Sequence, residues 1–390
     1  MKKKLVLAYS GGLDTSCCLK WLKDRGFEVV CFSADLGSEF SPAELMKKVA
    51  KFKGVKLYIK DLKKEFANEY ILPALKAGAL YQGKYLLNTA LGRPLIAKHL
   101  VEVANKEGAS FVSHGCTAKG NDQVRIEVGV KSLNSKLKIV APLREWELTS
   151  RETEIAYAKK HKIPITVTKK KIYSIDQNIW GVSIEAGILE DLNNEPTEDA
   201  FVLTQSLSKA PSKPQYITIE FKKGKPIKLN NKALDLVALI GKLNKIGGKH
   251  CIGRTDLIED RVVGIKSREI YEAPAAWILH TAHKELESLV LDKETLYFKE
   301  LVALKYSQLV YQGLWFSALK ESLDNFVEGT QKKVSGKITL KLCKGNIIIA
   351  KRNSSFSLYK KELATYGEGD KFDRNCAQGF INIWSQPFIG

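Results

Sequence analysis

Residues 4–16 read KLVLAYSGGLDTS, an apolar run that passes directly into two glycines and a group of hydroxyl side chains. The run over residues 4–9 is typical of a buried strand, and residues 14–25 have the apolar spacing of a helix. A strand that opens through Gly11 and Gly12 into a helix points backbone N–H groups and the positive end of the helix dipole at one place. The stretch therefore predicts an anion site of the kind that holds nucleotide phosphates.

Strand-like and helix-like segments alternate from this loop to about residue 165. Such alternation predicts parallel strands with helices on both faces, a doubly wound α/β sheet. Further strands are expected at residues 27–34, 55–59, 110–113 and 138–142. Further helices are expected at residues 42–53, 93–106, and from a capping box at 149–152 to residue 162.

The pattern changes after Pro164. Residues 216–221 and 223–225 predict one hairpin, and residues 337–342 and 347–351, separated by 344–346, predict a second. Residues 273–291 and 296–326 predict long helices. We therefore expect a nucleotide-binding domain over residues 1–165 and an α+β domain over 166–365. Residues 366–390 predict an arm that docks on another subunit, with a loose tail as the alternative.

The net charge of +19 comes from 62 basic and 43 acidic residues, and only ten of the basic residues are arginine. A nucleic-acid partner is one interpretation of this excess. The scattered lysines and the absence of an Arg-rich tail instead favour solvated lysines and small anionic substrates. We therefore predict no nucleic-acid partner.

Cysteine spacing and hydropathy narrow the class of protein further. The seven cysteines include no Cys-x-x-Cys pair, so we expect no bound zinc or other metal site and no redox motif. The size of the chain also makes a disulfide framework unexpected. No stretch approaches the ~20 apolar residues that a membrane span needs, and a cytoplasmic location is expected.

Residues 113–125 read SHGCTAKGNDQVR and form the densest polar cluster of the chain. The cluster follows a predicted strand, which places it at the carboxyl edge of the sheet, where such folds bind ligands. Its cationic and hydroxyl groups suit carboxylates, and Asp122 suits an α-amino group. This combination predicts recognition of an amino acid, with a solvated loop as the alternative.

The glycine loop lacks the Gly-Lys-Thr element of a P-loop and resembles the loop of the N-type ATP pyrophosphatases. That resemblance alone implies cleavage of ATP to AMP and pyrophosphate, and it fits several enzymes. Residues 8–16 and 113–125, together with 85–94 (YLLNTALGRP), 173–190 (YSIDQNIWGVSIEAGILE), 256–281 and 379–383, resemble the argininosuccinate synthase family. The likeness runs from about residue 4 to the C-terminus.

This resemblance implies a HUP/PP-loop domain, a larger α+β synthetase domain and a C-terminal oligomerisation arm in a homotetramer. It also implies ligation of citrulline and aspartate through a citrullyl-AMP intermediate, with ATP and Mg²⁺. The implied ATP-binding residues are Ala8, Tyr9, Ser10, Gly11, Gly12, Leu13, Asp14, Thr15, Ser16, Ala34 and Gly115. The implied aspartate-binding residues are Thr117, Asn121 and Asp122. The implied citrulline-binding residues are Tyr85, Asn121, Arg125, Ser174, Ser183, Glu259 and Tyr271, and no general base is assigned.

Two positions depart from the family pattern. Ala90 stands where many members carry a serine that contacts citrulline, and Ala118 stands where a glycine is usual. If position 118 needs a positive φ, alanine costs about 1 kcal/mol there. Two alternatives are therefore carried forward. One is a tRNA-modifying ATP pyrophosphatase, suggested by the net charge, and the other is a non-catalytic nucleotide-binding protein.

Overall fold

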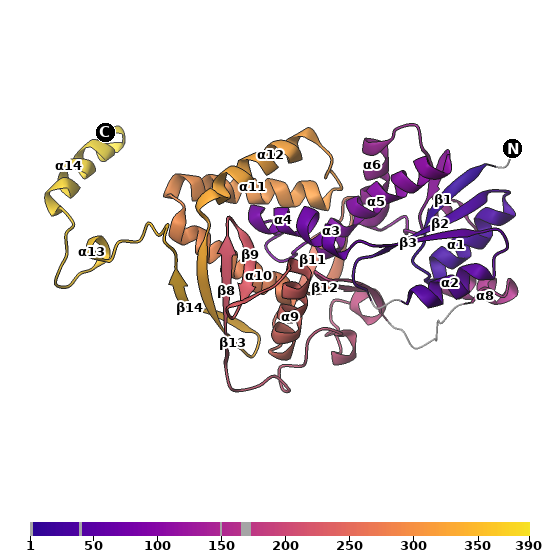
Figure 1. Cartoon of the computed structure of the whole chain (residues 1–390), viewed down its shortest axis with the longest axis horizontal. Helices are drawn as coiled ribbons and strands as arrows, with labels where there is room; N and C mark the ends of the chain where they lie inside the picture. Colours follow the sequence, from indigo (N-terminus) through magenta and orange to yellow (C-terminus); the bar gives the residue numbers. More distant parts are fainter. Residues whose placement is uncertain (1–2, 39–40, 149, 165–172) are drawn as a thin grey trace.

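The computed structural model describes residues 3–38, 41–148, 150–164 and 173–390. Figure 1 shows a parallel-sheet region at the N-terminal end, a mixed region beside it, and an extended arm at the C-terminal end. The boundary predicted at residues 165/166 lies outside the described residues, so the division into domains stays a prediction.

The N-terminal region contains one five-stranded parallel sheet with the strand order β3-β2-β1-β4-β5. Helices α1, α2 and α8 pack on one face of this sheet, and α5 and α6 pack on the other. The predicted doubly wound sheet is confirmed. The strands are β1 (Lys4–Ala8), β2 (Glu28–Asp35), β3 (Lys56–Asp61), β4 (Phe111–Ser113) and β5 (Lys138–Val140). The helices are α1 (Leu13–Asp24), α2 (Pro42–Ala50), α5 (Asn88–Glu107), α6 (Asn121–Leu133), α7 (Pro142–Glu145) and α8 (Arg151–Lys160).

Strand β1 shows how the sequence pattern builds the two layers. Leu5 and Leu7 enter the core beneath α1, while Val6 enters the core beneath α5, and all three are fully buried. A central parallel strand must be apolar on both faces, which explains its continuous apolar run. The α5-side core continues into the second region without a break.

The second region contains two antiparallel sheets. One has the order β10-β9-β8-β13-β14 and includes both predicted hairpins. The other has the order β11-β12-β7-β6 and was not predicted as strands. The strands are β6 (Ser174–Asn178), β7 (Gly181–Glu185), β8 (Gln215–Lys222), β9 (Lys225–Leu229), β10 (Lys232–Ala233), β11 (Arg254–Asp260), β12 (Lys266–Glu272), β13 (Gly336–Cys343) and β14 (Asn346–Asn353).

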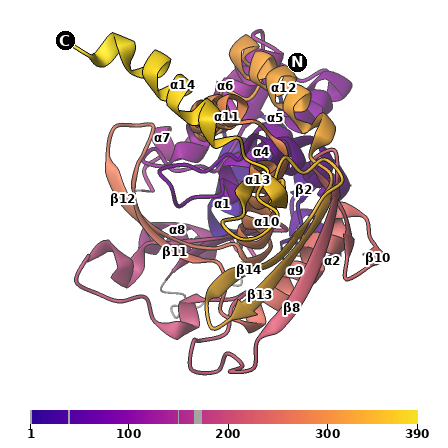
Figure 2. The same cartoon turned by 90° about the vertical axis from the view of Figure 1, so that its left-hand side faces the viewer.

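The remaining helices join the two regions and form the arm. A continuous segment follows β3, consisting of α3 (Lys63–Glu65), a π-helical turn (Phe66–Ile71) and α4 (Leu72–Ala77). The arm carries α13 (Lys361–Ala364) and α14 (Arg374–Ser385), and Figure 2 shows α14 projecting away from the sheets. The other helices are α9 (Leu236–Lys249), α10 (Pro274–Val290), α11 (Lys293–Tyr311) and α12 (Ala318–Thr330).

Several expectations about helices were wrong in detail. Residues 296–326 form two helices, because the chain breaks at Gly313, whose φ is +77°. Helix α8 is capped by Ser150 with Thr153, so the capping box starts one residue later than expected, and residue 149 lies outside the described part. The tail contains α14, a helix that was not predicted, and its side chains are all at least partly exposed.

Candidate active site

The loop after β1 is shaped by its glycines. Gly11 has a φ of +76°, a left-handed conformation that glycine adopts without strain, and Gly12 is extended. The Gly12 N–H donates to Ser10 Oγ at 3.3 Å, and Ser10 Oγ lies 3.1 Å from Thr15 Oγ1. In the described part of the chain no side chain caps the N-terminus of α1. The first turn of α1 therefore keeps backbone N–H groups available for an anion.

The second loop follows β4, the parallel neighbour of β1 on the side away from β2. Strand order reverses between β1 and β4, and ligands of doubly wound sheets bind at such a point. His114 fixes the turn, since its Nδ1 accepts the Cys116 N–H at 3.2 Å while its Nε2 lies 2.9 Å from Glu127 Oε1. His114 is thus a structural residue of this loop.

Gly115 brings the two loops into contact. A Cβ atom at this position would lie 2.7 Å from Thr15 Cγ2 and 3.4 Å from the Thr15 backbone nitrogen. Both glycine loops therefore face the same space above the carboxyl edge of the sheet.

We expect Gly115→Ala to raise the KM for ATP about tenfold, because the added methyl group must push the second loop away from the first turn of α1. Steady-state kinetics with ATP as the varied substrate measure this. Gly241→Ala is the matched control, since nothing lies within 4 Å of a Cβ at Gly241 on α9. Equal KM values for the two variants would contradict the contact.

A cavity of about 340 Å³ opens between the carboxyl edge of the parallel sheet and the sheet β11-β12-β7-β6. Every residue in the predicted aspartate and citrulline sets lines it. The lining predicted residues are Ala8, Tyr9, Ser10, Asp14, Thr15, Ala34, Tyr85, Gly115, Thr117, Asn121, Asp122, Arg125, Ser174, Ser183, Glu259 and Tyr271.

Four predicted nucleotide-site residues, Gly11, Gly12, Leu13 and Ser16, are not among the residues that line the cavity. Gly11 packs beneath Leu45 of α2, where an added Cβ would lie 2.2 Å from Leu45 Cδ2. Leu13 and Ser16 are buried, and Ser16 Oγ lies 3.1 Å from Tyr9 OH. The side chains at 13 and 16 therefore support the loop from the core side.

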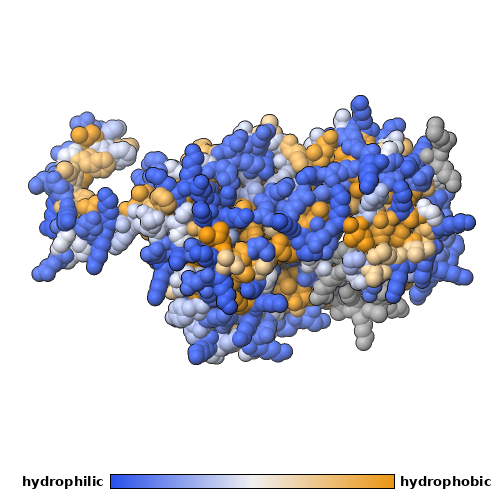
Figure 3. All heavy atoms as spheres, in the orientation of Figure 1, coloured by the Kyte–Doolittle hydropathy of each residue, from blue (hydrophilic) through white to orange (hydrophobic). Residues whose placement is uncertain are grey.

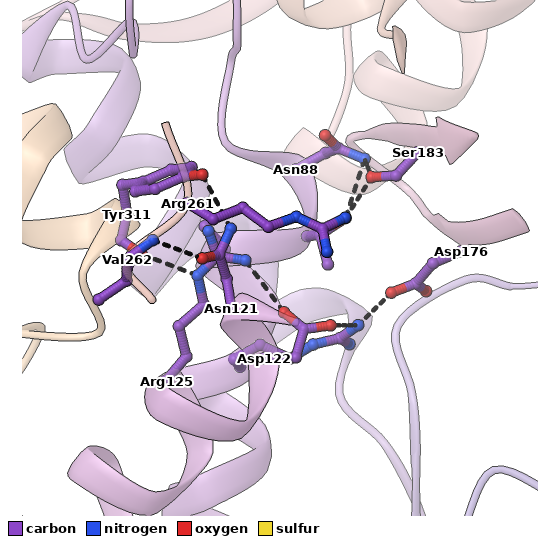
Figure 4. Close-up of polar contacts among 12 residues, drawn as sticks. Asn88, Asn121, Asp122, Arg125, Asp176, Ser183, Arg261, Val262 and Tyr311 are labelled. Atoms are coloured by element: carbon purple, nitrogen blue, oxygen red, sulfur yellow. Dashed lines mark hydrogen bonds and ion pairs between the residues drawn. The ribbon is translucent and has the colours of Figure 1, made fainter. Parts of the chain in front are cut away.

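Asp122 lies at the centre of an ion-pair cluster at the start of α6 (Figure 4). Its carboxylate pairs with Arg93 Nη2 at 2.7 Å and with Arg125 Nη1 at 3.0 Å, and Arg93 also contacts Asp176. Burial alone would raise the pKa of Asp122, but the two guanidinium groups hold that pKa at about 2. Arg93 Nε and Arg125 Nη2 are buried and have no hydrogen-bond partner among the residues that the structure describes, so the cluster retains unused donors.

Glu259 lies in a second polar cluster, beside the first. Its Oε1 accepts hydrogen bonds from Tyr311 OH at 2.8 Å and from Asn121 Nδ2 at 3.2 Å. Its Oε2 accepts from Tyr271 OH at 2.6 Å. A carboxylate has about four acceptor positions, so Oε2 retains one for a ligand donor. The Tyr271 ring also stacks on Tyr85, with ring centroids 4.0 Å apart.

Arg261 joins the second loop to the sheet β11-β12-β7-β6. Its Nη2 lies 2.6 Å from both Glu185 Oε2 and Glu269 Oε1, and its Nη1 donates to the Lys119 carbonyl oxygen at 3.1 Å. Burial, together with the neighbouring carboxylates, raises the pKa of Glu269 to about 8 despite the pairing with Arg261. Glu185 and Glu259, which also line the cavity, are therefore the groups suited to a ligand ammonium group.

Strand alternation explains which side chains of the second region reach the cavity. Residues two apart on β6, β7 and β12 line it, while the residues between them are apolar or face another core, as Val182, Ile184 and Ile270 do. Period-two polar spacing in residues 174–176, 183–185 and 269–271 was the available signal. The lining residues that sequence reasoning missed include Thr89, Arg93, Asp176, Glu185, Arg261 and Glu269.

The two departures from the family pattern do not distort the site. The φ angle of Ala118 is not positive. The strain that a positive φ would have caused there therefore does not arise. Ala90 is fully buried and does not line the cavity. The neighbouring Thr89 lines the cavity and is hydrogen-bonded to Ser183.

All seven cysteines are free thiols, and Cys17, Cys18 and Cys31 are buried. Burial raises the pKa of Cys116, the one that lines the cavity. Within the described ranges no three His, Cys, Asp or Glu side chains are grouped as a metal site. The helices of the same ranges include none that is long and apolar enough to cross a membrane.

The chain is similar along its whole length to known proteins. Residues 4–164 match the arginosuccinate synthase N-terminal HUP domain, and residues 173–388 match the arginosuccinate synthase C-terminal domain. An argininosuccinate synthase of Carboxydothermus hydrogenoformans is 54% identical over 388 residues, which cover 99% of this chain and 97% of that protein. Argininosuccinate synthases of Caldanaerobacter subterraneus subsp. tengcongensis and Pelotomaculum thermopropionicum are 54% and 51% identical, over 98% of this chain and 93% and 96% of their own.

Proposed function

Because the chain belongs to the argininosuccinate synthase family, whose members are ATP-dependent ligases of arginine biosynthesis, we propose that it joins citrulline to aspartate through citrullyl-AMP. The products are argininosuccinate, AMP and pyrophosphate. One observation supports this most: residues of both loops and every predicted amino-acid-binding residue line the same cavity.

In this proposal the nucleotide lies against the first loop and Gly115. The uncapped first turn of α1, with the hydroxyl groups of Ser10 and Thr15, holds the β- and γ-phosphates. Asp14 is the carboxylate of the loop that lines the cavity, and oxygen ligands of this kind suit Mg²⁺ bound to ATP. Mg²⁺ would reduce the negative charge of the triphosphate.

The two amino acids occupy the remaining clusters. The citrulline carboxylate accepts from the unpartnered Arg125 Nη2, and its ammonium group donates to Glu259 Oε2. Ser174, Ser183, Tyr85 and Tyr271 complete the citrulline site, while Thr117, Asn121 and Asp122 hold aspartate. Asp122 is ionised above a pH of about 2 and therefore accepts from the aspartate ammonium group.

The reaction then proceeds by two displacements. The ureido oxygen of citrulline attacks the α-phosphorus of ATP, and pyrophosphate leaves with the electron pair of the broken P–O bond. The ammonium group of aspartate first releases a proton to solvent, and the resulting amine attacks the activated ureido carbon. AMP then leaves with the electron pair of the broken C–O bond, and the new C–N nitrogen loses a second proton. Positioning and charge neutralisation supply most of the acceleration in chemistry of this kind.

Substrate dependence tests the proposal directly. Pyrophosphate release is expected only with ATP, Mg²⁺ and citrulline present, and AMP release is expected to need aspartate as well. Separate assays of the two products measure this. Pyrophosphate release that ignores citrulline would rule the proposal out. The similarity to argininosuccinate synthases over nearly the whole chain favours this ligase over the tRNA-modifying and non-catalytic alternatives.

The arm over residues 366–390 supports a homotetramer as part of this proposal. It extends from the body, and Figure 3 shows apolar atoms on its surface. A stable monomer rarely exposes this much apolar surface on a projecting helix. The exposed side chains are Tyr366, Phe372, Phe380, Ile381, Ile383, Trp384, Phe388 and Ile389.

Deleting residues 366–390 is expected to convert the assembly into smaller species, because these apolar side chains lose their docking surface on a neighbouring subunit. Light scattering coupled to gel filtration measures the mass. Leu192→Ser is the control, because Leu192 is an apolar side chain that is similarly exposed but lies outside the arm. An unchanged mass for the deletion variant would contradict the role of the arm.

A further inference from the structure

The pyrophosphate loop lacks a positive charge of its own to balance the negative charge of the phosphates. Residues 10–16 contain no cationic side chain, and their one charged side chain is the carboxylate of Asp14. ATP brings several negative charges to this place. The three arginines that line the cavity are already paired with carboxylates: Arg93 with Asp122 and Asp176, Arg125 with Asp122, and Arg261 with Glu185 and Glu269.

Lys48 of α2 brings a positive charge to the loop from outside the cavity. Its Nζ donates to the Gly11 carbonyl oxygen at 2.8 Å, and its side chain is half-buried. Within the described residues, Lys48 forms no ion pair with a carboxylate. Helix α2 is held close to the loop by the buried Leu45, which packs on Gly11.

This hydrogen bond acts on one peptide group. The Gly11 carbonyl and the Gly12 N–H belong to the same trans peptide, so they point in opposite directions. The Gly12 N–H donates to Ser10 Oγ, and Ser10 lines the cavity. A cation on the carbonyl oxygen therefore keeps this N–H directed toward Ser10 at the edge of the cavity and polarises it, so that a phosphate oxygen can replace Ser10 Oγ as its acceptor.

We propose that Lys48 is a positioning residue of the pyrophosphate site, which orients the Gly11–Gly12 peptide toward the β- and γ-phosphates and supplies positive potential. It takes the place of the cation that a P-loop carries within its own sequence. This inference rests on the proposed cleavage of ATP to AMP and pyrophosphate. It adds a residue on α2, outside the loop and outside the cavity lining.

Lys48→Met is the test, with Lys47→Met as the matched control. Lys47 is the adjacent residue on the same helix and is exposed. In Lys48→Met we expect the KM for ATP to rise about tenfold and product inhibition by pyrophosphate to weaken in parallel, because a charge-assisted hydrogen bond is lost. The KM values for citrulline and aspartate should stay within about twofold, since those sites lie in other clusters. A purely structural change would not confine its effect to ATP and pyrophosphate.

Lys48→Arg keeps the charge and donors and is expected to recover most of the affinity for ATP. Thermal unfolding with and without inorganic pyrophosphate gives a second readout that needs no turnover. Pyrophosphate should raise the Tm of the unsubstituted protein and of Lys47→Met, but scarcely that of Lys48→Met. If Lys48→Met does not fold, Lys48→Gln replaces it in both measurements.

Equal KM values for ATP, and equal pyrophosphate effects on Tm, in the Lys48 and Lys47 variants would overturn the inference. Failure of the proposed function looks different, because the unsubstituted protein would then form no AMP from ATP, citrulline and aspartate.

Discussion

Arg125→Met is expected to lower kcat/KM for citrulline about a thousandfold. The Arg125 side chain is only 4% exposed and is fixed by Asp122 and by its Nε, which donates to the Tyr311 carbonyl oxygen at 2.8 Å. Its remaining Nη2 is the donor that we assign to the citrulline carboxylate. Removing one member of a buried ion pair typically costs about 3–5 kcal/mol, and each 1.4 kcal/mol of lost transition-state binding is about tenfold in rate.

Arg125→Lys separates charge from geometry. Lysine keeps the positive charge but cannot donate in three fixed directions, so we expect a loss of about tenfold to a hundredfold. Arg352→Met is the control, because Arg352 is an exposed arginine on β14 whose partner is Glu285. Circular dichroism checks that each variant is folded. A folded Arg125→Met protein with citrulline kinetics like those of Arg352→Met would refute the assignment.

The nucleotide half of the site was predictable because its signals are local. A strand, two glycines and a helix follow one another within residues 4–25, and Gly11 has the positive φ that glycine adopts without strain. The second loop was predictable in the same way, from a strand followed by a run of polar residues. Helix α5 was placed five residues too late, since the helix begins at Asn88 and contains Pro94. The hydroxyl of Tyr85 accepts from Thr89 N–H and Ala90 N–H and so stabilises the earlier start.

The amino-acid half was found through family resemblance, and its ion pairs were not found at all. Arg93 and Asp122 are 29 residues apart, and Arg261 and Glu185 are 76 residues apart. No local pattern reports such pairs, since they form only when segments that are far apart in the sequence pack together. The alternating polar residues of β6, β7 and β12 do carry a signal, which is visible once those segments are recognised as strands.

The break between α11 and α12 also depends on contacts between residues that are far apart in the sequence. A Cβ at Gly313 would lie 2.7 Å from the Arg125 Cα atom, so this turn packs directly against α6. The turn also brings the Tyr311 hydroxyl and carbonyl to Glu259 and Arg125. The helical periodicity of residues 296–326 concealed a turn whose position is set by the site.

Thermal stability is expected to fall as the pH rises from about 6.5 through 8, because two buried carboxyl groups must ionise. Burial, followed by the proximity of Asp14, raises the pKa of Glu154 from 4.5 to about 8. Burial and neighbouring carboxylates raise the pKa of Glu269 to about 8 as well. Between the two values the folded chain holds protons that the unfolded chain has released. The stabilisation that Glu154 and Glu269 give to the folded protein is therefore complete below about pH 4.5 and is lost as the pH rises through 8.

Groups whose pKa is lowered in the folded protein titrate mainly below this window. Asp122 and Glu107 have pKa values lowered to about 2, so their stabilising contributions are complete well below pH 6.5. Burial lowers the pKa of His280 from 6.5 to about 4, and its effect on stability is therefore largely complete by pH 6.5. The slope between pH 6.5 and 8 thus reports chiefly on Glu154 and Glu269. Each carboxyl that stays protonated contributes about 1.4 kcal/mol per pH unit.

Glutamine at either position removes one of these titrations while keeping the shape of a neutral carboxyl group. We expect Glu154→Gln and Glu269→Gln each to reduce the fall in Tm between pH 6.5 and 8 by about half, and the double variant to make it nearly flat. Glu294→Gln is the control, because the Glu294 side chain is 84% exposed. Differential scanning calorimetry across this range measures the slopes. Slopes in both buried-site variants that match the control would show that neither carboxyl holds a proton in the folded protein at neutral pH.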